Sequence, residues 1–483
     1  YYSSTFTPTS ELYVTQYTMS QDSNAFEIIQ PEGPKWDDGF DHDDVTKIYV
    51  IGGKDGIQFI KIDYIKSGEP KNGSFHGYTG GGFKEMFEID NLKNEYLESV
   101  EGYYCSLSGG FITAIQFKTN LRVSELMGYT NNIGRKLILA NHGKKIIGFK
   151  GFILRTLDDL DAYFTPITPT RMEAQGGKGG VEWDDGADHD SVTKIQVRIN
   201  KEGIQYIKFN YVDKDGDPEE QVHGSDTGKG NKLEPFEINH IDKEYLLSID
   251  GYYNEDSGVI QTLQFKTNIK TSEVMGNDEE GTKFTLGCNG HEIIGFHGYA
   301  QDNLNSLGVY ITTLPLTKLE YKGSGGEIWD DGTFQGVKKV TIYSCNDSIR
   351  CIVFEYVNDG KMETRVHGTK IEVDVTKDEF VLDYPNEFLT SVEGTYDTMI
   401  TSLTFKSSKN RTSLRVGKAS DSSFLLESKG CALVGFHGAS TYGYLYTLGA
   451  YSFPMTPLAE AGKLYTQAGD RGASQDNGGF GGV

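Results

Sequence analysis

Cysteine is scarce in this sequence, with five residues among 483. Their number is odd and their spacing is irregular, at Cys105, Cys288, Cys345, Cys351 and Cys431. A disulfide framework that recurs along the chain is therefore excluded. Cys345 and Cys351 flank a predicted hairpin turn and could form a disulfide, but we interpret them as free thiols.

Basic residues are also fewer than acidic ones: the sequence has 46 Lys and Arg and 69 Asp and Glu, which gives a net charge of −23. Binding of phosphate groups needs basic patches, so nucleic acids and anionic membranes are not expected partners. No apolar run approaches the roughly 20 residues that span a bilayer, and no signal-peptide pattern is visible. The composition, 37% hydrophobic, is that of a soluble globular protein.

Proline is rare and glycine abundant, with 12 and 59 residues, and no long amphipathic helix pattern is found. Ile195, Val197 and Ile199 alternate with polar residues, the period of two of a half-buried strand. A turn follows, and a second apolar strand begins at Ile204. Short strands that alternate with glycine-rich turns predict an all-β protein.

The chain contains three copies of one block. Its three tryptophans, Trp36, Trp183 and Trp329, each open the string WDDG and lie 147 and 146 residues apart (183 − 36 and 329 − 183). Three further landmarks recur in the same order, namely YLESVEGYY with YLLSIDGYY and FLTSVEGTY, IQFKTN with LQFKTN and LTFKSS, and IIGFKG with IIGFHG and LVGFHG. A regular interval of domain size predicts three tandem copies of one fold.

We predict domains at residues 21–168, 169–316 and 317–458. Residues 1–20 resemble the end of the first copy, so we expect them to be the tail of a preceding repeat. Residues 459–483 repeat the glycine-rich opening of a copy, with Gln475 at the tryptophan position, and read as the truncated start of a fourth repeat. The sequence is therefore interpreted as part of a longer tandem protein.

These strings resemble the jacalin-related lectins, and in particular the tandem mannose-binding members of Brassicaceae. The resemblance rests on the glycine-rich segment before WDDG, on YLxSxxGYY and QFKTN, and on the closing GFHG and LGVY strings. It implies three tandem β-prism domains, each made of three four-stranded antiparallel sheets. Periodicity alone would not distinguish this fold from a barrel or a sandwich.

The resemblance also implies where a sugar would bind. Family members use a Gly-Gly pair, which lets backbone N–H groups approach the ring closely, and a GxxxD loop, whose carboxylate accepts hydrogen bonds from neighbouring hydroxyls. The second copy keeps both features. Its candidate carbohydrate-binding residues are Gly179, Gly180, Gly298, Tyr299, Ala300, Gln301 and Asp302, with Asp302 as the hydroxyl acceptor. The loop at 254–257 is expected at the edge of this site.

The other two copies depart from the pattern. In the first, Glu32-Gly33-Pro34 replaces the glycine pair and Arg155 stands where Asp302 stands, so no mannose-type site is expected. In the third, Tyr442 replaces the acid; a phenol is a weaker acceptor, although it can stack on a sugar face. Its weaker candidates are Gly325, Gly326, Gly438, Thr441 and Tyr442.

Other polar clusters favour structural roles. The acidic residues after each WDDG lack the spacing of an EF-hand and are interpreted as turn residues, so no metal is expected. The recurring His-Gly pairs, which begin at His76, His223 and His367, have no nucleophile beside them and are interpreted as core or rim histidines. No catalytic motif is found, and neither an enzymatic activity nor a cofactor is expected.

The sequence therefore favours a lectin for mannose- or glucose-type glycans or glycoproteins, with the second copy as its best site. Self-association is compatible with this function, since one weak site per chain gains avidity by linkage. The alternative, from the resemblance to myrosinase-binding proteins, is a scaffold for glycosylated β-glucosidases in plant defence. The same resemblance implies a cytoplasmic, vacuolar or ER-body location.

Overall fold

The computed structural model describes residues 17–19, 26–28, 35–78, 82–105, 110–130, 133–141, 143–226, 230–277, 281–288, 290–345, 348–370, 375–441 and 443–455. Nearly all of the regular structure is antiparallel strand, and the described helices are two short 3-10 turns, η1 (Asn91–Lys93) and η2 (His240–Asp242). None of the described helices is long and apolar enough to cross a membrane. The prediction of an all-β protein is confirmed.

Domain 1 runs from β3 to β14 and contains three sheets. The first has the order β14 (Leu157–Pro166), β13 (Lys144–Ile153) and β3 (Lys35–Asp37). The second has β6 (Glu69–Lys71), β5 (Gly56–Lys66), β4 (Asp44–Gly53) and β8 (Phe83–Glu88), with β7 (Phe75–Gly77) also paired to β5. The third has β11 (Met127–Gly128), β10 (Ile112–Thr119), β9 (Leu97–Cys105) and β12 (Ile133–Ala140).

Domain 2 repeats this plan. Its first sheet is β15 (Thr170–Gly176), β27 (Leu304–Thr313), β26 (His291–Ala300) and β16 (Val181–Asp184). Its second is β19 (Pro218–Gly224), β18 (Gly203–Asp213), β17 (His189–Asn200) and β20 (Asn231–Lys232), with β21 (Phe236–Glu237) also on β17. Its third is β24 (Met275–Gly276), β23 (Ile260–Thr267), β22 (Leu246–Tyr253) and β25 (Thr282–Gly287).

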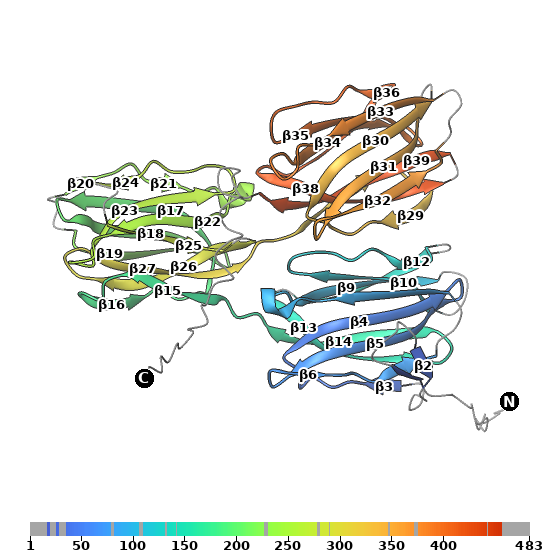
Figure 1. The fold of residues 1–483 in the computed structure, drawn as a ribbon, viewed down its shortest axis with the longest axis horizontal. Coiled ribbons are helices and arrows are strands. Elements are labelled where there is room, and N and C mark those ends of the chain that lie inside the picture. The colour runs from blue at the N-terminus through green and yellow to red at the C-terminus, as the bar shows by residue number, and fades with distance from the viewer. Residues whose placement is uncertain are drawn as a thin grey trace, which may run out of the picture. The chain divides into compact units, whose positions relative to one another are not determined.

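Domain 3 has three four-stranded sheets. The first is β28 (Thr317–Lys322), β39 (Tyr444–Pro454), β38 (Cys431–Thr441) and β29 (Glu327–Asp330). The second is β32 (Lys361–Gly368), β31 (Ser348–Asn358), β30 (Gly336–Cys345) and β33 (Thr376–Val381). The third is β36 (Val416–Gly417), β35 (Ile400–Ser407), β34 (Leu389–Tyr396) and β37 (Ser422–Glu427). Each domain is a β-prism, as expected, except that the first sheet of domain 1 has three strands within the described residues (Figure 1). A separate pair, β1 (Tyr17–Met19) and β2 (Phe26–Ile28), precedes domain 1.

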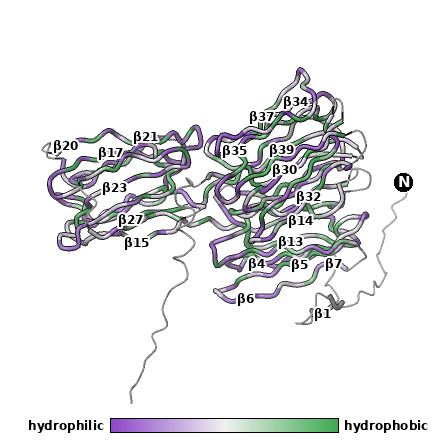
Figure 2. Tube along the Cα trace, turned by 45° about the horizontal axis from the view of Figure 1, so that its top comes forward, coloured by the Kyte–Doolittle hydropathy of each residue, from purple (hydrophilic) through white to green (hydrophobic). Residues whose placement is uncertain are grey.

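The repeated strings supply the three cores. The phenylalanine of QFKT or LTFKS is fully buried in every domain, and so is that of GFKG or GFHG; they are Phe117, Phe265, Phe405, Phe149, Phe296 and Phe436. Hydrophobic residues follow the strands such as β4 and β5, whereas β6 is hydrophilic (Figure 2). Burial of a large aromatic side chain contributes about 2–3 kcal/mol, so these strings recur because each core needs them.

The WDDG and His-Gly strings meet inside each domain. In domain 2 the ring of His223 stacks on Trp183 at 3.5 Å, and its Nε2 lies 2.8 Å from Oδ1 of Asp185. Tyr211 donates its hydroxyl hydrogen to Oδ2 of the same carboxylate at 2.6 Å. Domains 1 and 3 build the same cluster around Asp38 and Asp331. A buried carboxylate is stable because these donors satisfy it. The interpretation of the His-Gly pairs as core or rim histidines is confirmed, since His76 and His367 are buried and His223 is half-buried.

Cys345 and Cys351 do not form a disulfide. Both thiols are free, and Cys351 is fully buried on β31. In the β30–β31 ladder Cys351 lies opposite Tyr343, and Cys345 lies opposite Ser348. Burial raises the pKa of the Cys351 thiol to about 11, so this side chain remains a neutral apolar group of the core.

Candidate functional site

Three loops converge at one end of domain 2. They are residues 177–180 between β15 and β16, residues 254–258 between β22 and β23, and the turn between β26 and β27 with the strand ends that flank it, residues 300–305. The backbone N–H of Gly177 is shared between the carbonyls of Gly258 and Asn305, both at 2.9 Å. One donor therefore ties all three loops together, including the loop that the sequence placed at the edge of the site.

The glycine pair lies directly against the 300–305 turn. A Cβ at Gly179 would lie 2.8 Å from the side-chain amide of Asn305, and one at Gly180 would lie 2.7 Å from the carbonyl of Ala300. Gly180 also has a φ of +85°, which side chains rarely adopt. Both glycines are exposed. The contact therefore requires glycine here, and it leaves bare backbone at the surface beside the turn.

The turn is anchored from below by a polar network. Asn303 is 7% exposed and donates from Nδ2 to Oε2 of Glu202 at 2.7 Å, while its Oδ1 accepts from Nδ2 of Asn200 at 2.7 Å. Glu202 and Asn200 belong to the tip of the β17–β18 hairpin, where the N–H of Glu202 donates to Oδ1 of Asn200 at 2.8 Å. Because both ends of the Asn303 amide are satisfied, the turn is held in one conformation.

The predicted residues divide into two groups. Gln301 and Asp302 are exposed at the tip of the turn, and Ala300 lies buried at its base beside Gly180. Gly298 and Tyr299 lie on β26 instead, where Gly298 packs against the ring of Trp183 and Tyr299 pairs with Glu182 on β16. Burial, together with the Glu182 carboxylate, raises the pKa of the Tyr299 phenol. The glycine pair, Ala300, Gln301 and Asp302 thus lie together, and Gly298 has a packing role.

Asn305 is a site residue that the sequence reasoning missed. With its amide nitrogen turned inward, it donates to the carbonyls of Asn303 and Gly179, both at 3.1 Å. Asn305 stands two residues before the LGVY string, and the same count reaches Asp158 in domain 1 and Tyr446 in domain 3. Counting residues back from LGVY, rather than forward from GFHG, would have identified Asn305 from the sequence.

In domain 3 an aromatic ring lies against the glycine pair. Cβ atoms at Gly325 and Gly326 would lie 3.2 and 3.1 Å from the ring of Tyr446. The neighbouring Tyr444 is covered by the guanidinium of Arg350 at 3.9 Å, and Arg350 donates to the carbonyl of Gly443 at 3.1 Å. Gly325 and Gly326 are exposed, as Gly179 and Gly180 are, so the two domains differ in the side chain beside the glycine pair, which is an amide in domain 2 and a tyrosine ring in domain 3.

The remaining candidates of domain 3 contribute less. Gly438 packs against Trp329, as Gly298 does against Trp183, and Thr441 ends β38. Tyr442 lies outside the described residues.

Domain 1 keeps an acid at the Asn305 place. Asp158 accepts a hydrogen bond from the hydroxyl of Thr156 at 2.9 Å, and Arg155 is exposed in the same turn. Glu32, Gly33 and Pro34 lie outside the described residues. The prediction that this domain has no mannose-type site therefore stays a prediction.

The acidic residues after WDDG have structural partners. Oδ1 of Asp184 accepts from the N–H of Gly186 at 2.8 Å, and its Oδ2 accepts from the hydroxyl of Tyr310 at 2.8 Å. Domains 1 and 3 use Asp37 and Asp330 in the same way. Among the described residues no group of three His, Cys, Asp or Glu side chains is placed to hold a metal ion.

Comparisons with known proteins agree with this geometry. The family model of the Jacalin-like lectin domain matches residues 28–163, 172–310 and 320–451. Jacalin-related lectin 12 of Arabidopsis thaliana is 76% identical, over 92% of this chain and 98% of that relative. Jacalin-related lectin 13 of the same plant is 57% identical, over 93% and 96%.

Solved structures resemble single domains. A complex of artocarpin with mannopentose is 31% identical and covers 30% of this chain and 99% of that one, with a TM-score of 0.27. A banana lectin is 26% identical over 30% and 99%, with the same TM-score.

Three β-prism domains, each matched by the model of the Jacalin-like lectin domain, define a carbohydrate-binding protein. The chain belongs to the jacalin-related lectins.

Proposed function

We propose that the chain binds mannose- or glucose-type glycans through the loop end of domain 2, with Gly179, Gly180, Ala300, Gln301, Asp302 and Asn305 as the site. The observation that carries the proposal is the exposed glycine pair packed against an anchored turn that presents Asp302. A pyranose offers neighbouring hydroxyls, and such a group needs a charged acceptor and close backbone donors. Domain 2 supplies both within one turn.

The roles follow from the chemistry of each group. The Asp302 carboxylate accepts from two sugar hydroxyls, and N–H groups of the turn donate to ring and hydroxyl oxygens. Hydrogen bonds to a charged acceptor contribute about 1.5–3 kcal/mol each. A single shallow site of this kind gives modest affinity, so recognition of glycoproteins would depend on several linked sites.

The test is calorimetric titration of the chain with mannose and a mannose-rich glycan, with Asp302→Ala as the variant. We expect binding at one site per chain, and a loss of about 100-fold or more in the variant, because the charged acceptor disappears. Circular dichroism should show an unchanged fold, since Asp302 is exposed on a turn. Equal binding by the variant would move the site elsewhere, and no binding by the parent would refute the proposal.

A second candidate function is a scaffold that binds glycosylated β-glucosidases. It is favoured by the tyrosine against the glycine pair of domain 3, which leaves that surface suited to contacts other than polar sugar recognition. Tyrosine is also enriched at protein interfaces. Capture of such an enzyme that persists in excess free mannose would support this candidate, whereas release by mannose would mean that capture is by sugar alone.

A further inference from the structure

Arg350 of domain 3 is a half-buried cation that has no acidic partner. It lies on β31, its guanidinium covers the ring of Tyr444 at 3.9 Å, and its Nη1 donates to the carbonyl of Gly443 at 3.1 Å. Its Nε is buried and has no hydrogen-bond partner. Within the described part of the chain, therefore, both contacts of the guanidinium are neutral groups, and no carboxylate balances its charge.

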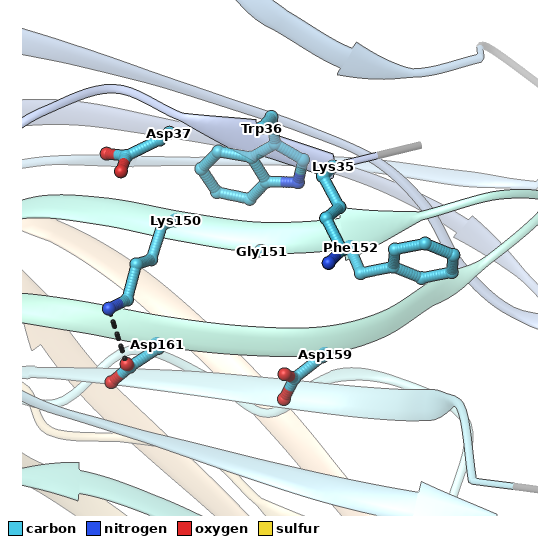
Figure 3. A pocket seen from close by; sticks show the side chains of 8 residues that line it. All are labelled: Lys35, Trp36, Asp37, Lys150, Gly151, Phe152, Asp159 and Asp161. Carbon is cyan, nitrogen blue, oxygen red and sulfur yellow. Dashed lines mark ion pairs between the residues drawn. The ribbon is translucent and has the colours of Figure 1, made fainter. Parts of the chain in front are cut away.

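Cations elsewhere in the chain pair with neighbouring acids, as two examples show. Arg411 of the same domain pairs with Glu387 at 2.7 Å. Lys150, which lines a pocket of domain 1, pairs with Asp161 at 3.2 Å (Figure 3). Partial burial of a charge is costly unless a counter-ion is present. The guanidinium of Arg350 is therefore available to an anion that the described residues do not supply.

The arginine is particular to domain 3. Arg350 is the third residue of β31, and the third residues of β18 and β5 are Gln205 and Gln58. The backbone is equivalent in the three domains, because the carbonyl of this residue accepts from the N–H that follows the His-Gly pair, at 3.2, 3.0 and 3.0 Å in domains 3, 2 and 1. The same position thus carries a neutral amide in two domains and a positive charge in the third.

Arg350 also inverts the charge of the group that anchors the last turn. Tyr444 stands four residues before the LGAY string, as Asn303 stands four residues before LGVY. In domain 2 the amide of Asn303 is held by the carboxylate of Glu202, whereas in domain 3 the ring of Tyr444 is held by the guanidinium of Arg350. The two turns are therefore anchored by groups of opposite charge.

Two tyrosine rings connect Arg350 to the glycine pair. The rings of Tyr444 and Tyr446 lie edge to face with their centroids 6.5 Å apart, and Tyr446 lies against Gly325 and Gly326. Both tyrosines are half-buried and both glycines are exposed. A pyranose can place its apolar face on an aromatic ring while its hydroxyls bond to polar groups. Domain 3 thus offers an aromatic surface with a cation at one end and bare backbone at the other.

The loops of domain 3 carry fewer acids than those around the site of domain 2. In domain 2 Glu255, Asp256 and Asp302 are exposed on the converging loops. In domain 3 the sequence has no charged residue at 323–326 or 440–444, and residues 397–399 contribute Asp397. Like charges repel an approaching anion, whereas an unpaired arginine attracts it. An acidic ligand is therefore disfavoured by domain 2 and favoured by domain 3.

We propose that the loop end of domain 3 binds a carboxylate-bearing saccharide of the uronic acid class. The carboxylate accepts two hydrogen bonds from the guanidinium of Arg350, whose planar fork suits this geometry, and the pyranose ring lies on Tyr446. The exposed glycine pair beside that ring admits the sugar without a side-chain clash. This site differs from that of domain 2 in both place and ligand charge, so it does not depend on the mannose-type site proposed above.

The first test compares a trimer of galacturonic acid with the same trimer methyl-esterified, which removes the charge and keeps the rings. Both are titrated calorimetrically into the full chain carrying Asp302→Ala, which removes the site proposed in domain 2. We expect the acid to bind about tenfold or more tightly than the ester, and Arg350→Gln, which restores the amide of the other two domains, to abolish this preference.

Lys361→Gln is the matched control for this test. It removes one positive charge from an exposed residue at the opposite end of β31, so the preference for the acid should remain. Absence of binding by both trimers, equal binding of acid and ester, or a preference that persists in Arg350→Gln would overturn the proposal.

A second test separates a saccharide from an acidic peptide. Triglutamate presents carboxylates without a sugar ring, and it should bind about tenfold or more weakly than the galacturonate trimer. Tyr446→Asn removes the aromatic ring and introduces the residue that domain 2 has at this place, so the trimer should weaken by about fivefold. Equal binding of peptide and trimer, or an unchanged affinity in Tyr446→Asn, would contradict a saccharide seated on tyrosine.

Discussion

Domains 2 and 3 share a fold, a core and a glycine pair, yet they differ at the one place where a sugar would bind. In domain 2 the pair faces Asn305, whose amide donates to the neighbouring carbonyls. In domain 3 the same place holds Tyr446, and its ring lies against both glycines. The two domains also differ in the turn itself, where Tyr442 stands in place of Asp302.

This comparison separates what the fold needs from what binding needs. The buried cluster of Trp183, His223 and Asp185 recurs in domain 3 with equivalent contacts. The turn between the last two strands is not constrained by the core and differs in all three domains. The buried cluster is thus held in common by the three copies, and we propose that the exposed turn decides whether a copy binds.

The largest effect should come from giving domain 2 the tyrosine that domain 3 has at the position of Asn305. Asn305→Tyr places a ring against Gly179, so we expect glycan binding by domain 2 to fall by about 100-fold or more, since the ring displaces backbone donors from the ligand. Titration calorimetry measures the loss. Asn305→Ser, which adds no ring and keeps a small hydrogen-bond donor, is the control and should retain binding. An Asn305→Tyr variant that binds normally would mean that Asn305 lies outside the site.

A pH-dependent difference in stability should come next. Burial lowers the pKa of His437 in domain 3 to about 4, from 6.5. Its folded form is therefore neutral, whereas the unfolded chain takes up a proton below 6.5. The free energy of unfolding therefore has its full value above pH 6.5. It falls as the pH drops towards 4, by at most about 3 kcal/mol.

Thermal unfolding between pH 7 and 4 measures this effect. His437→Gln removes the titrating group, and it should flatten the decline while keeping a donor near the Leu319 carbonyl. A decline that is equally steep in this variant would exclude His437 as the cause.

The smallest effect is a gain of binding in domain 3. Tyr446→Asn removes the ring that lies beside Gly325 and Gly326, and we expect a weak second site, which raises the glycan stoichiometry above one. The effect is small because Tyr442 replaces the acid. A glycan titration of Tyr446→Asn combined with Asp302→Ala isolates this site. A double variant without binding would show that a glycine pair without a neighbouring ring is insufficient.

The sequence predicted most of the fold because the repeated strings are buried residues with a fixed role. Trp36, Trp183 and Trp329 could be aligned without a structure, and each lies beside its histidine as a packed pair. The resemblance to lectins supplied the β-prism, which periodicity could not.

The site was predicted in part. Gly179 and Gly180 were found because close approach of backbone requires glycine, and they do contact the predicted turn. Asn305 was missed because an amide at the end of a strand has no distinctive pattern, and its role depends on a contact with a loop more than 100 residues earlier. Gly298 was assigned to the site, but its contact with Trp183 gives it a packing role.

The central claim is that domain 2, and not domain 1 or 3, carries the working mannose-type glycan site and that Asn305 belongs to it. The most direct measurement is the number of mannose-rich glycans bound per chain, for the parent and for Asn305→Tyr, by calorimetry at matched protein concentrations. The account predicts one glycan per parent chain and none for the variant. Two or three glycans per parent chain, or one that persists in Asn305→Tyr, would contradict it.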